Sequence, residues 1–325
     1  MRADTRMIMF RVLLALLPGT AALAWFFGAG VLLNLLLACA TALLTEAAVL
    51  RARGRSLASL LDGSALVAGA LLALTLPPLL PFWMLVIGTA FAMLFGKHLY
   101  GGLGHNPFNP AMVGYAALII SFPLAMSTWP QAGVSLALAD ILNAKLWQSG
   151  PLANLQALAN DGLSGATALD TIKFRGALTI DETWQASQGL GQFAGLGWEW
   201  INAGFLLGGI YLLGSRTISH MAPLGMLFGL GACALVFYDS GSSESLGSPL
   251  FHLLGGGTML GAFFIVTDPV SSPDSRAGLW LFGLGVGLLT FLIRSIGAYP
   301  DGIAFAVLLM NALVPLMDYV RLRRP

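Results

Sequence analysis

The chain has 325 residues, of which 57% are hydrophobic and only 10% are charged, and its mean hydropathy is +0.81. A soluble globular domain carries about 25% charged residues, so this composition excludes that class and indicates a polytopic helical membrane protein. The net charge of +1 and the lack of a basic patch with interleaved aromatic residues give no indication of nucleic-acid binding. Cys39 and Cys233 both lie inside apolar runs, which favours small core residues over a metal site shared between subunits.

Apolar runs that approach the length needed to span a bilayer follow one another along the chain. Five precede and five follow a long polar segment, at about 12–27, 31–50, 64–76, 82–95, 111–127, 201–214, 221–238, 250–266, 278–296 and 302–318. The predicted division is therefore a first membrane half at 1–128, a loop at 129–200 and a second membrane half at 201–325. Ala22-Leu23-Ala24 resembles a signal-peptide cleavage site, but we expect an uncleaved first helix, because its loss would leave the halves unequal.

The distribution of Lys and Arg predicts the orientation in the membrane. Ten helices put both termini on one side, and a cytoplasmic location for the termini leaves only four of the 16 basic residues outside: Lys145, Lys173, Arg175 and Arg294. Basic residues concentrate on the cytoplasmic side of membrane proteins. We therefore expect both termini in the cytoplasm and the loop 129–200 in the periplasm or outside the cell.

The two halves carry matching small residues and prolines. Each pair is 192 residues apart, and the pairs are Gly63 and Gly255, Gly69 and Gly261, Ala70 and Ala262, Thr75 and Thr267, and Pro77 and Pro269. Helix packing alone could place small residues at these spacings. A true repeat of five helices would instead be inverted, with a binding site near the midplane where helices are broken.

Two irregular stretches, 106–114 and 267–273, break the apolar pattern beside predicted helices. Their polar side chains could cap helix ends at a tight turn or line a cavity for a ligand or an ion, and they are Asn106, Asn109, Thr267, Asp268 and Ser271. Charge inside a bilayer is costly and often functional. Glu46, inside an apolar run, and Asp268, at a break, are therefore candidates for an ion path.

The central loop contains the sequence Asp161-Gly-Leu-Ser-Gly-Ala-Thr167. Composition alone is compatible with an ordinary Ser/Gly turn. The small residues Gly165 and Ala166 also leave the Thr167 hydroxyl accessible, and the Asp161 carboxylate could position an enzyme that modifies it.

This stretch resembles the acceptor signature of flavin transferases, which attach FMN through its phosphate to the threonine hydroxyl. Three further stretches, Asp62–Gly69 continuing to Pro78, 106–114 and 267–273, occur with it in an order that resembles the RnfD/NqrB family of membrane redox subunits. Total length is closer to the RnfD branch. Ala168 departs from the family, in which a proline often follows the threonine, but it lies outside the acceptor core.

The resemblance implies a subunit of the ion-translocating Rnf complex of the bacterial inner membrane, which couples electron flow between ferredoxin and NAD to Na⁺ or H⁺ transport. It implies FMN esterified to Thr167, an attachment motif formed by Asp161, Ser164, Gly165 and Ala166, and a possible second, non-covalent flavin (riboflavin or FMN). The two irregular stretches would then line a cavity for a flavin ring. The implied fold is two inverted five-helix repeats similar to ammonium or urea transporters, and the implied partners are RnfA, RnfB, RnfC, RnfE, RnfG and a flavin transferase.

The competing function is a secondary transporter or channel without a redox cofactor, and a scaffold subunit is a third. Broken helices and an inverted repeat suit a transporter equally well. Only the flavin acceptor signature separates these readings, since neither a transporter nor a scaffold needs one.

Overall fold

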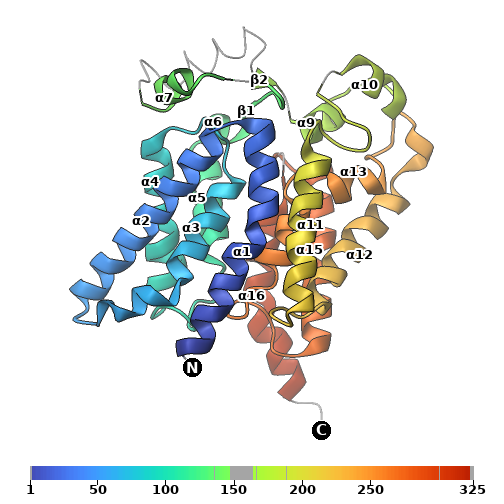
Figure 1. The fold of residues 1–325 in the computed structure, drawn as a ribbon. Helices are drawn as coiled ribbons and strands as arrows, with labels where there is room; N and C mark the ends of the chain where they lie inside the picture. Colours follow the sequence, from blue (N-terminus) through green and yellow to red (C-terminus); the bar gives the residue numbers. More distant parts are fainter. Residues whose placement is uncertain are drawn as a thin grey trace. The chain divides into compact units, whose positions relative to one another are not determined.

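The computed structural model describes residues 2–134, 136–146, 164–165, 167–187, 189–299 and 301–322. The chain divides into two compact units, Met1–Gly165 and Ala166–Pro325. Both are built mainly of helices, and Figure 1 follows them from blue to red along the chain.

The first unit contains two long helices, several shorter ones and one strand pair. Its α-helices are α1 (Arg2–Phe27), α2 (Gly30–Ala52), α3 (Ser64–Thr75), α4 (Phe82–Phe91), α5 (Pro110–Ser121), α6 (Pro123–Ser127) and α7 (Leu138–Leu146). A 3₁₀-helix, Leu57–Asp62, precedes α3, and a π-helix, Ala92–His98, continues α4. Strands β1 (Trp129–Pro130) and β2 (Ser164–Gly165) pair antiparallel, with Trp129 opposite Gly165.

The second unit begins with two short helices and continues with apolar ones. Its α-helices are α9 (Ala168–Lys173), α10 (Ile180–Ala186), α11 (Trp198–Gly214), α12 (Met221–Val236), α13 (Pro249–Leu254), α14 (Thr258–Leu260), α15 (Arg276–Ile296) and α16 (Ile303–Leu322). A 3₁₀ turn, Asp239–Gly241, follows α12, and a π-helix, Gly261–Ile265, continues α14.

The apolar helices are those of a multi-pass membrane protein. Thr5–Phe27, Gly30–Ala52 and Arg276–Ile296 are long and apolar enough to cross a bilayer, and several shorter apolar helices accompany them. Large apolar side chains point outward, including Leu44 at 71% exposure and Phe228 at 60%. Lipid solvates such faces and water does not, so the expectation of a polytopic membrane protein agrees with the fold. The arrangement as ten helices in two inverted repeats stays a prediction.

The predicted run 250–266 is not one continuous helix. Helix α13 ends at Leu254, the backbone turns through Gly255–Gly257, and α14 begins at Thr258. Gly256 has a φ of +54°, a conformation that side chains with a Cβ rarely adopt. The apolar pattern did not reveal this break, because glycine interrupts a helix without changing the hydropathy of the run.

A buried amide satisfies the backbone groups that this break leaves open. Asn202 of α11 donates from Nδ2 to the carbonyl oxygens of Leu254 (2.7 Å) and Gly256 (2.9 Å), and its Oδ1 accepts from the backbone N–H of Met259 (2.9 Å). Non-helical backbone at membrane depth requires internal partners of this kind. Asn202 therefore replaces the helix hydrogen bonds that the glycine turn interrupts.

Glycines also bring α12 and α15 into close contact. A Cβ on Gly287 would lie 2.2 Å from the carbonyl oxygen of Met226, and one on Gly283 would lie 2.1 Å from that of Ala222. Because lipid gives little hydrophobic driving force for helix association, packing of small residues holds membrane helices together. Helix α15 of this closely packed pair carries Arg294 of the site described next.

Candidate functional site

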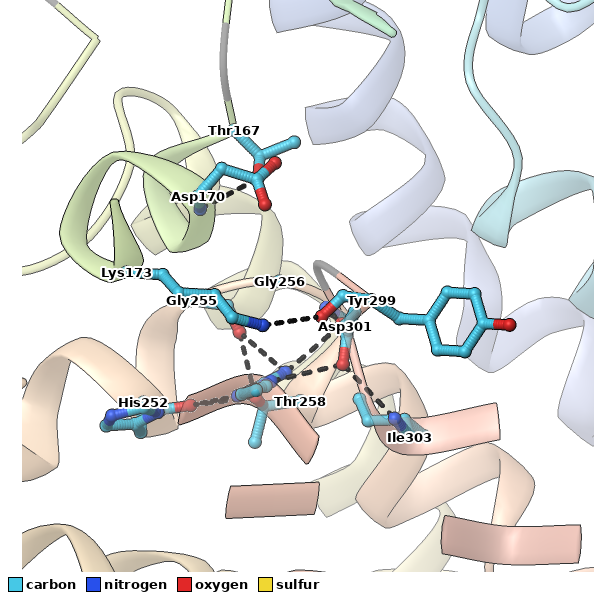
Figure 2. A network of polar contacts seen from close by, with 12 residues as sticks. Thr167, Asp170, Lys173, His252, Gly255, Gly256, Thr258, Tyr299, Asp301 and Ile303 are labelled. Carbon is cyan, nitrogen blue, oxygen red and sulfur yellow. Dashed lines mark hydrogen bonds and ion pairs between the residues drawn. The ribbon is translucent and has the colours of Figure 1, made fainter. Parts of the chain in front are cut away.

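Thr167 lies directly before α9 and caps its first turn. Its Oγ1 accepts a hydrogen bond from the backbone N–H of Asp170 (3.2 Å) and donates one to the Asp170 carboxylate (2.7 Å), as Figure 2 shows. Thr167 as a whole is half-buried. A threonine at this position satisfies amides that a helix start leaves without partners.

The remaining residues of the predicted attachment motif are described only in part. Asp161 and Ala166 lie outside the described residues, and Ser164 and Gly165 form strand β2. The carboxylate that contacts the Thr167 hydroxyl belongs to Asp170, a residue that the sequence analysis did not single out. The spacing Thr-x-x-Asp at a helix start was the available signal for it.

Two basic side chains tie the α9 segment to loops of the second unit. The Lys173 ammonium donates to the backbone carbonyls of Gly297 and Tyr299, just after α15. Arg175 donates from Nη2 to the carbonyls of Ser243 and Ser245, between α12 and α13. Burial lowers the pKa of both groups, and Asp170 and Glu244 respectively oppose that shift.

Arg294 and Asp301 fix the glycine turn between α13 and α14. The Arg294 guanidinium, 1% exposed, contacts both carboxylate oxygens of Asp301 at 3.1 Å. It also donates to the carbonyl of His252 (2.9 Å), and Asp301 accepts from the backbone N–H of Gly257 (3.2 Å). Figure 2 shows this network together with Thr167, Asp170 and Lys173. The ion pair therefore bridges the end of α15 and the broken helix.

A cavity of about 40 Å³ lies beside α9 in the second unit. We call it the basic cavity, because its polar lining residues are Lys173, Arg175, His252, Arg294 and Ser295. Its apolar lining comes from Leu169, Ile172, Leu246 and Phe251. Two buried lining atoms, Nδ1 of His252 and Oγ of Ser295, have no hydrogen-bond partner within the described part of the chain.

The predicted ion-path residue Glu46 is buried in the first unit and carries a counter-charge. Its carboxylate lies 2.7 and 2.9 Å from Nζ of Lys97, which also donates to the hydroxyl of Ser64 at the start of α3 (2.7 Å). Nε2 of His98 lies 3.7 Å from the same carboxylate. Lys97 lies just beyond the predicted apolar run 82–95, yet it is only 2% exposed. The π-helix Ala92–His98 turns it inward.

The other predicted lining residues mostly cap local turns. In the first unit, Asn109 accepts from the backbone N–H of Met112 at the start of α5 (3.2 Å), and Asn106 donates to the carbonyl of Phe108 (3.0 Å). Oδ1 of Asn106 is buried without a partner among the described residues.

In the second unit, three predicted residues gather in one turn after the π-helix. The Asp268 carboxylate accepts from the Ser271 hydroxyl (3.0 Å), and Thr267 donates to the carbonyl of Phe263 (2.8 Å). Asn311 of α16 holds the turn by donating to the Ser271 carbonyl (2.8 Å).

Lys145 is a second buried basic residue that the sequence analysis did not identify as part of a site. It reaches from α7 into the first unit, where Nζ donates to Oδ1 of Asn34 (2.5 Å) and to the carbonyl of Leu80 (3.0 Å). The ammonium lies 5.1 Å from the centre of the Phe82 ring. Burial lowers the pKa of Lys145 to about 7.

Comparison with known proteins identifies the family. The sequence model of the NQR2, RnfD, RnfE family matches residues 1–325. A relative from Pseudomonas paraeruginosa, named as the D component of an ion-translocating oxidoreductase complex, is 53% identical over 97% of this chain and 90% of its own length. Relatives of the same name from Ectopseudomonas mendocina and Salmonella typhi are 52% and 48% identical over 97% of this chain and over 90% and 92% of their own lengths. The chain therefore belongs to the NQR2, RnfD, RnfE family.

Proposed function

We propose that this chain is a membrane subunit of an ion-translocating oxidoreductase complex and carries electrons through FMN esterified to Thr167. The observation that carries the first part is the match to relatives of that name along 97% of the chain. The name of those relatives also implies that the chain works together with other subunits. The second part rests on the sequence Ser164-Gly-Ala-Thr167 and on the half-buried position of the threonine at its end.

The surroundings of Thr167 are compatible with a phosphoester. The hydroxyl is half-buried and stands at the start of a helix, not inside one. An ester oxygen could still accept the hydrogen bond from the backbone N–H of Asp170, whereas the bond now donated to the Asp170 carboxylate would be lost. Lys173, at the end of the same short helix, is a basic group available to a phosphate.

The residues of the second unit would position the group and transmit its state. When bound, FMN supplies the electron transfer, and the protein sets its position and electrostatic environment. Lys173 connects α9 to the end of α15, and Arg294 and Asp301 connect that end to the glycine turn Gly255–Gly257. A change in charge near α9 would therefore act on a turn in a membrane helix. This physical connection supports a role in ion coupling.

In-gel fluorescence of the protein made together with a flavin transferase tests the attachment. We expect a fluorescent band in a denaturing gel for the wild type and none for Thr167→Ala. Thr171→Ala is the matched control, because Thr171 lies one turn further along and donates to the Thr167 carbonyl (3.1 Å). A dark wild-type band, with the transferase active on another acceptor, would contradict the flavin proposal and favour a transporter or channel.

Glu46 and Asp268 remain our candidates for the ion path. The pair of Glu46 with Lys97 suggests that a cation would have to compete with the ammonium for the carboxylate. Glu46→Gln and Asp268→Asn should each lower ion pumping by the assembled complex while electron transfer continues. Unchanged pumping in both variants would remove them from the path.

A further inference from the structure

We propose that the basic cavity beside α9 binds a small oxyanion, with a phosphate group as its ligand chemistry. The argument rests on the charge of the lining, on the hydrogen-bond donors that remain there, and on two buried polar atoms without partners. None of these observations depends on a flavin at Thr167.

The charge of the lining favours an anion over a cation. Three of the lining side chains are basic, Lys173, Arg175 and Arg294, and none of the lining residues is acidic. Asp301 places both of its carboxylate oxygens on Arg294 and therefore compensates the charge of that residue only. Such a lining repels Na⁺ and hydronium, so the cavity does not suit an ion path for a cation. Burial also lowers the pKa of Lys173 and Arg175 more than Asp170 and Glu244 raise it, and a bound oxyanion would offset the remaining cost.

The basic side chains keep donors for a ligand. Hydrogen bonds within the described chain occupy two of the three Nζ–H groups of Lys173, with the carbonyls of Gly297 and Tyr299 as acceptors. They occupy four of the five N–H groups of Arg294. The carbonyl contacts thus hold both cations in place while each retains one donor.

Two further polar atoms in the cavity have no hydrogen-bond partner within the described residues. The Ser295 hydroxyl is buried without an acceptor among the described residues, and so is Nδ1 of His252, whose Nε2 contacts the Leu246 carbonyl at 2.8 Å. His252 is only 2% exposed. Buried polar atoms without partners are costly, so these two indicate an occupant. A phosphate oxygen can accept from Ser295. Because Nε2 of His252 donates to the Leu246 carbonyl, Nδ1 of the neutral imidazole is an acceptor, and the P–OH of a hydrogen phosphate can donate to it.

The ligand could come from two sources with the same chemistry. One is free inorganic phosphate, and the other is the phosphate of a group attached at Thr167, since α9 contributes Leu169, Ile172 and Lys173 to the cavity. The experiment below separates the two.

Phosphate binding to the full chain without flavin tests the proposal. We would purify Thr167→Ala in nanodiscs and measure thermal unfolding in increasing inorganic phosphate, with chloride as the comparison at equal ionic strength. We expect saturable stabilisation by phosphate and none by chloride. Lys173→Met and Ser295→Ala, each added to Thr167→Ala, should weaken phosphate binding about tenfold or more, because each removes a donor to a charged ligand.

Arg276→Met in the same background is the matched control for Lys173→Met, because it removes the same charge from an exposed position of the second unit. Stabilisation that is equal in chloride, or equal in the Lys173→Met and Arg276→Met variants, would overturn the proposal. If Lys173→Met fails to fold, Ser295→Ala decides, because Oγ of Ser295 makes no hydrogen bond within the described chain.

The flavin-carrying wild type then identifies the source. Phosphate binding to Thr167→Ala but not to the flavin-carrying protein would assign the cavity to the attached phosphate, and binding to both would assign it to a free anion. A failure of flavin attachment would leave the phosphate measurement on Thr167→Ala intact, so the two proposals fail independently.

Discussion

Four basic residues predicted to lie on the outer side of the membrane share one structural role. Lys145, Lys173, Arg175 and Arg294 all donate hydrogen bonds to backbone carbonyls at helix ends or in loops. A basic residue outside the cytoplasm opposes the usual charge bias. At these four positions a hydrogen bond to a backbone carbonyl accounts for the exception. A basic residue that the charge count places outside the cytoplasm was therefore a signal in the sequence that could have pointed to the site.

Lys145 should make the stability of the first unit depend on pH. Its pKa is about 7 in the folded chain and 10.5 ordinarily. Between these values the unfolded chain binds a proton that the folded chain does not, so stability from this group rises with pH from about 7 to 10.5 and stays low below 7. Thermal unfolding followed from pH 7 to pH 10 should therefore show a smaller rise for Lys145→Met than for the wild type.

The control for Lys145→Met is Asn143→Met, on the exposed face of the same helix, which should keep the wild-type dependence on pH. Equal slopes for the wild type and Lys145→Met would show that the ammonium does not titrate in this range.

The sequence indicated Thr167, the proposed acceptor, but not its contacts. Thr167 stood out because a polar Ser-Gly-Ala-Thr sequence has no packing reason to occur there. Asp170 and Asp301 did not, because an acidic residue in a loop is usually solvated, and only the folded chain brings them together with Thr167 and Arg294.

At the level of elements, the break between α13 and α14 is the feature most relevant to function. The hydropathy pattern did not show this break, because the chain is apolar on both sides of it. Three successive glycines, Gly255–Gly257, were nevertheless present in the sequence. The same limitation applies to the π-helix Ala92–His98, because its sequence has the composition of an ordinary helix end. Both irregular elements hold polar groups inside an otherwise apolar unit. Interruptions of a regular α-helix, π-helices among them, are frequent at functional sites.

Gly256→Ala should destabilise the second unit by more than backbone strain alone. The added Cβ would lie 2.6 Å from Oδ2 of Asp301 and 2.9 Å from Nη2 of Arg294, so the buried ion pair must separate. Strain at positive φ costs about 1–2 kcal/mol, and weakening a buried pair adds about 2 kcal/mol or more. Thermal unfolding in detergent measures the sum.

Gly176→Ala separates the two contributions. Gly176 has a φ of +68°, and a Cβ there would meet nothing within 4 Å, so its cost is backbone strain only. We expect the fall in Tm for Gly256→Ala to be at least twice that for Gly176→Ala. A similar fall for both would mean that the ion pair adjusts without cost and that the turn is less tightly held than its contacts indicate.

At the scale of the whole molecule, each unit has a buried cation near the end of its fourth apolar helix. Lys97 follows α4 and bonds to Ser64, the first residue of α3, while Arg294 ends α15 and bonds to the carbonyls of His252 and Gly255 beside α14. In both units the cation thus bonds to the third apolar segment, at its start in the first unit and at its glycine break in the second. This likeness within the units supports the predicted repeat, which composition and spacing alone left open to chance.

In the predicted orientation Lys97 lies on the cytoplasmic side of the membrane and Arg294 on the outer side, as an inverted repeat requires. Twelve of the 16 basic residues are cytoplasmic in that orientation, and Thr167 and the basic cavity face the periplasm. A chain with Cys39→Ala and Cys233→Ala can carry a single new cysteine at an exposed position, either Ala52→Cys at the end of α2 or Asp181→Cys in α10. A membrane-impermeant thiol reagent added to spheroplasts should label Asp181→Cys and should label Ala52→Cys only after the membrane is opened. Labelling of Ala52→Cys in intact spheroplasts would contradict the orientation, and labelling of Ala52→Cys without Asp181→Cys would also place the Thr167 hydroxyl on the cytoplasmic side.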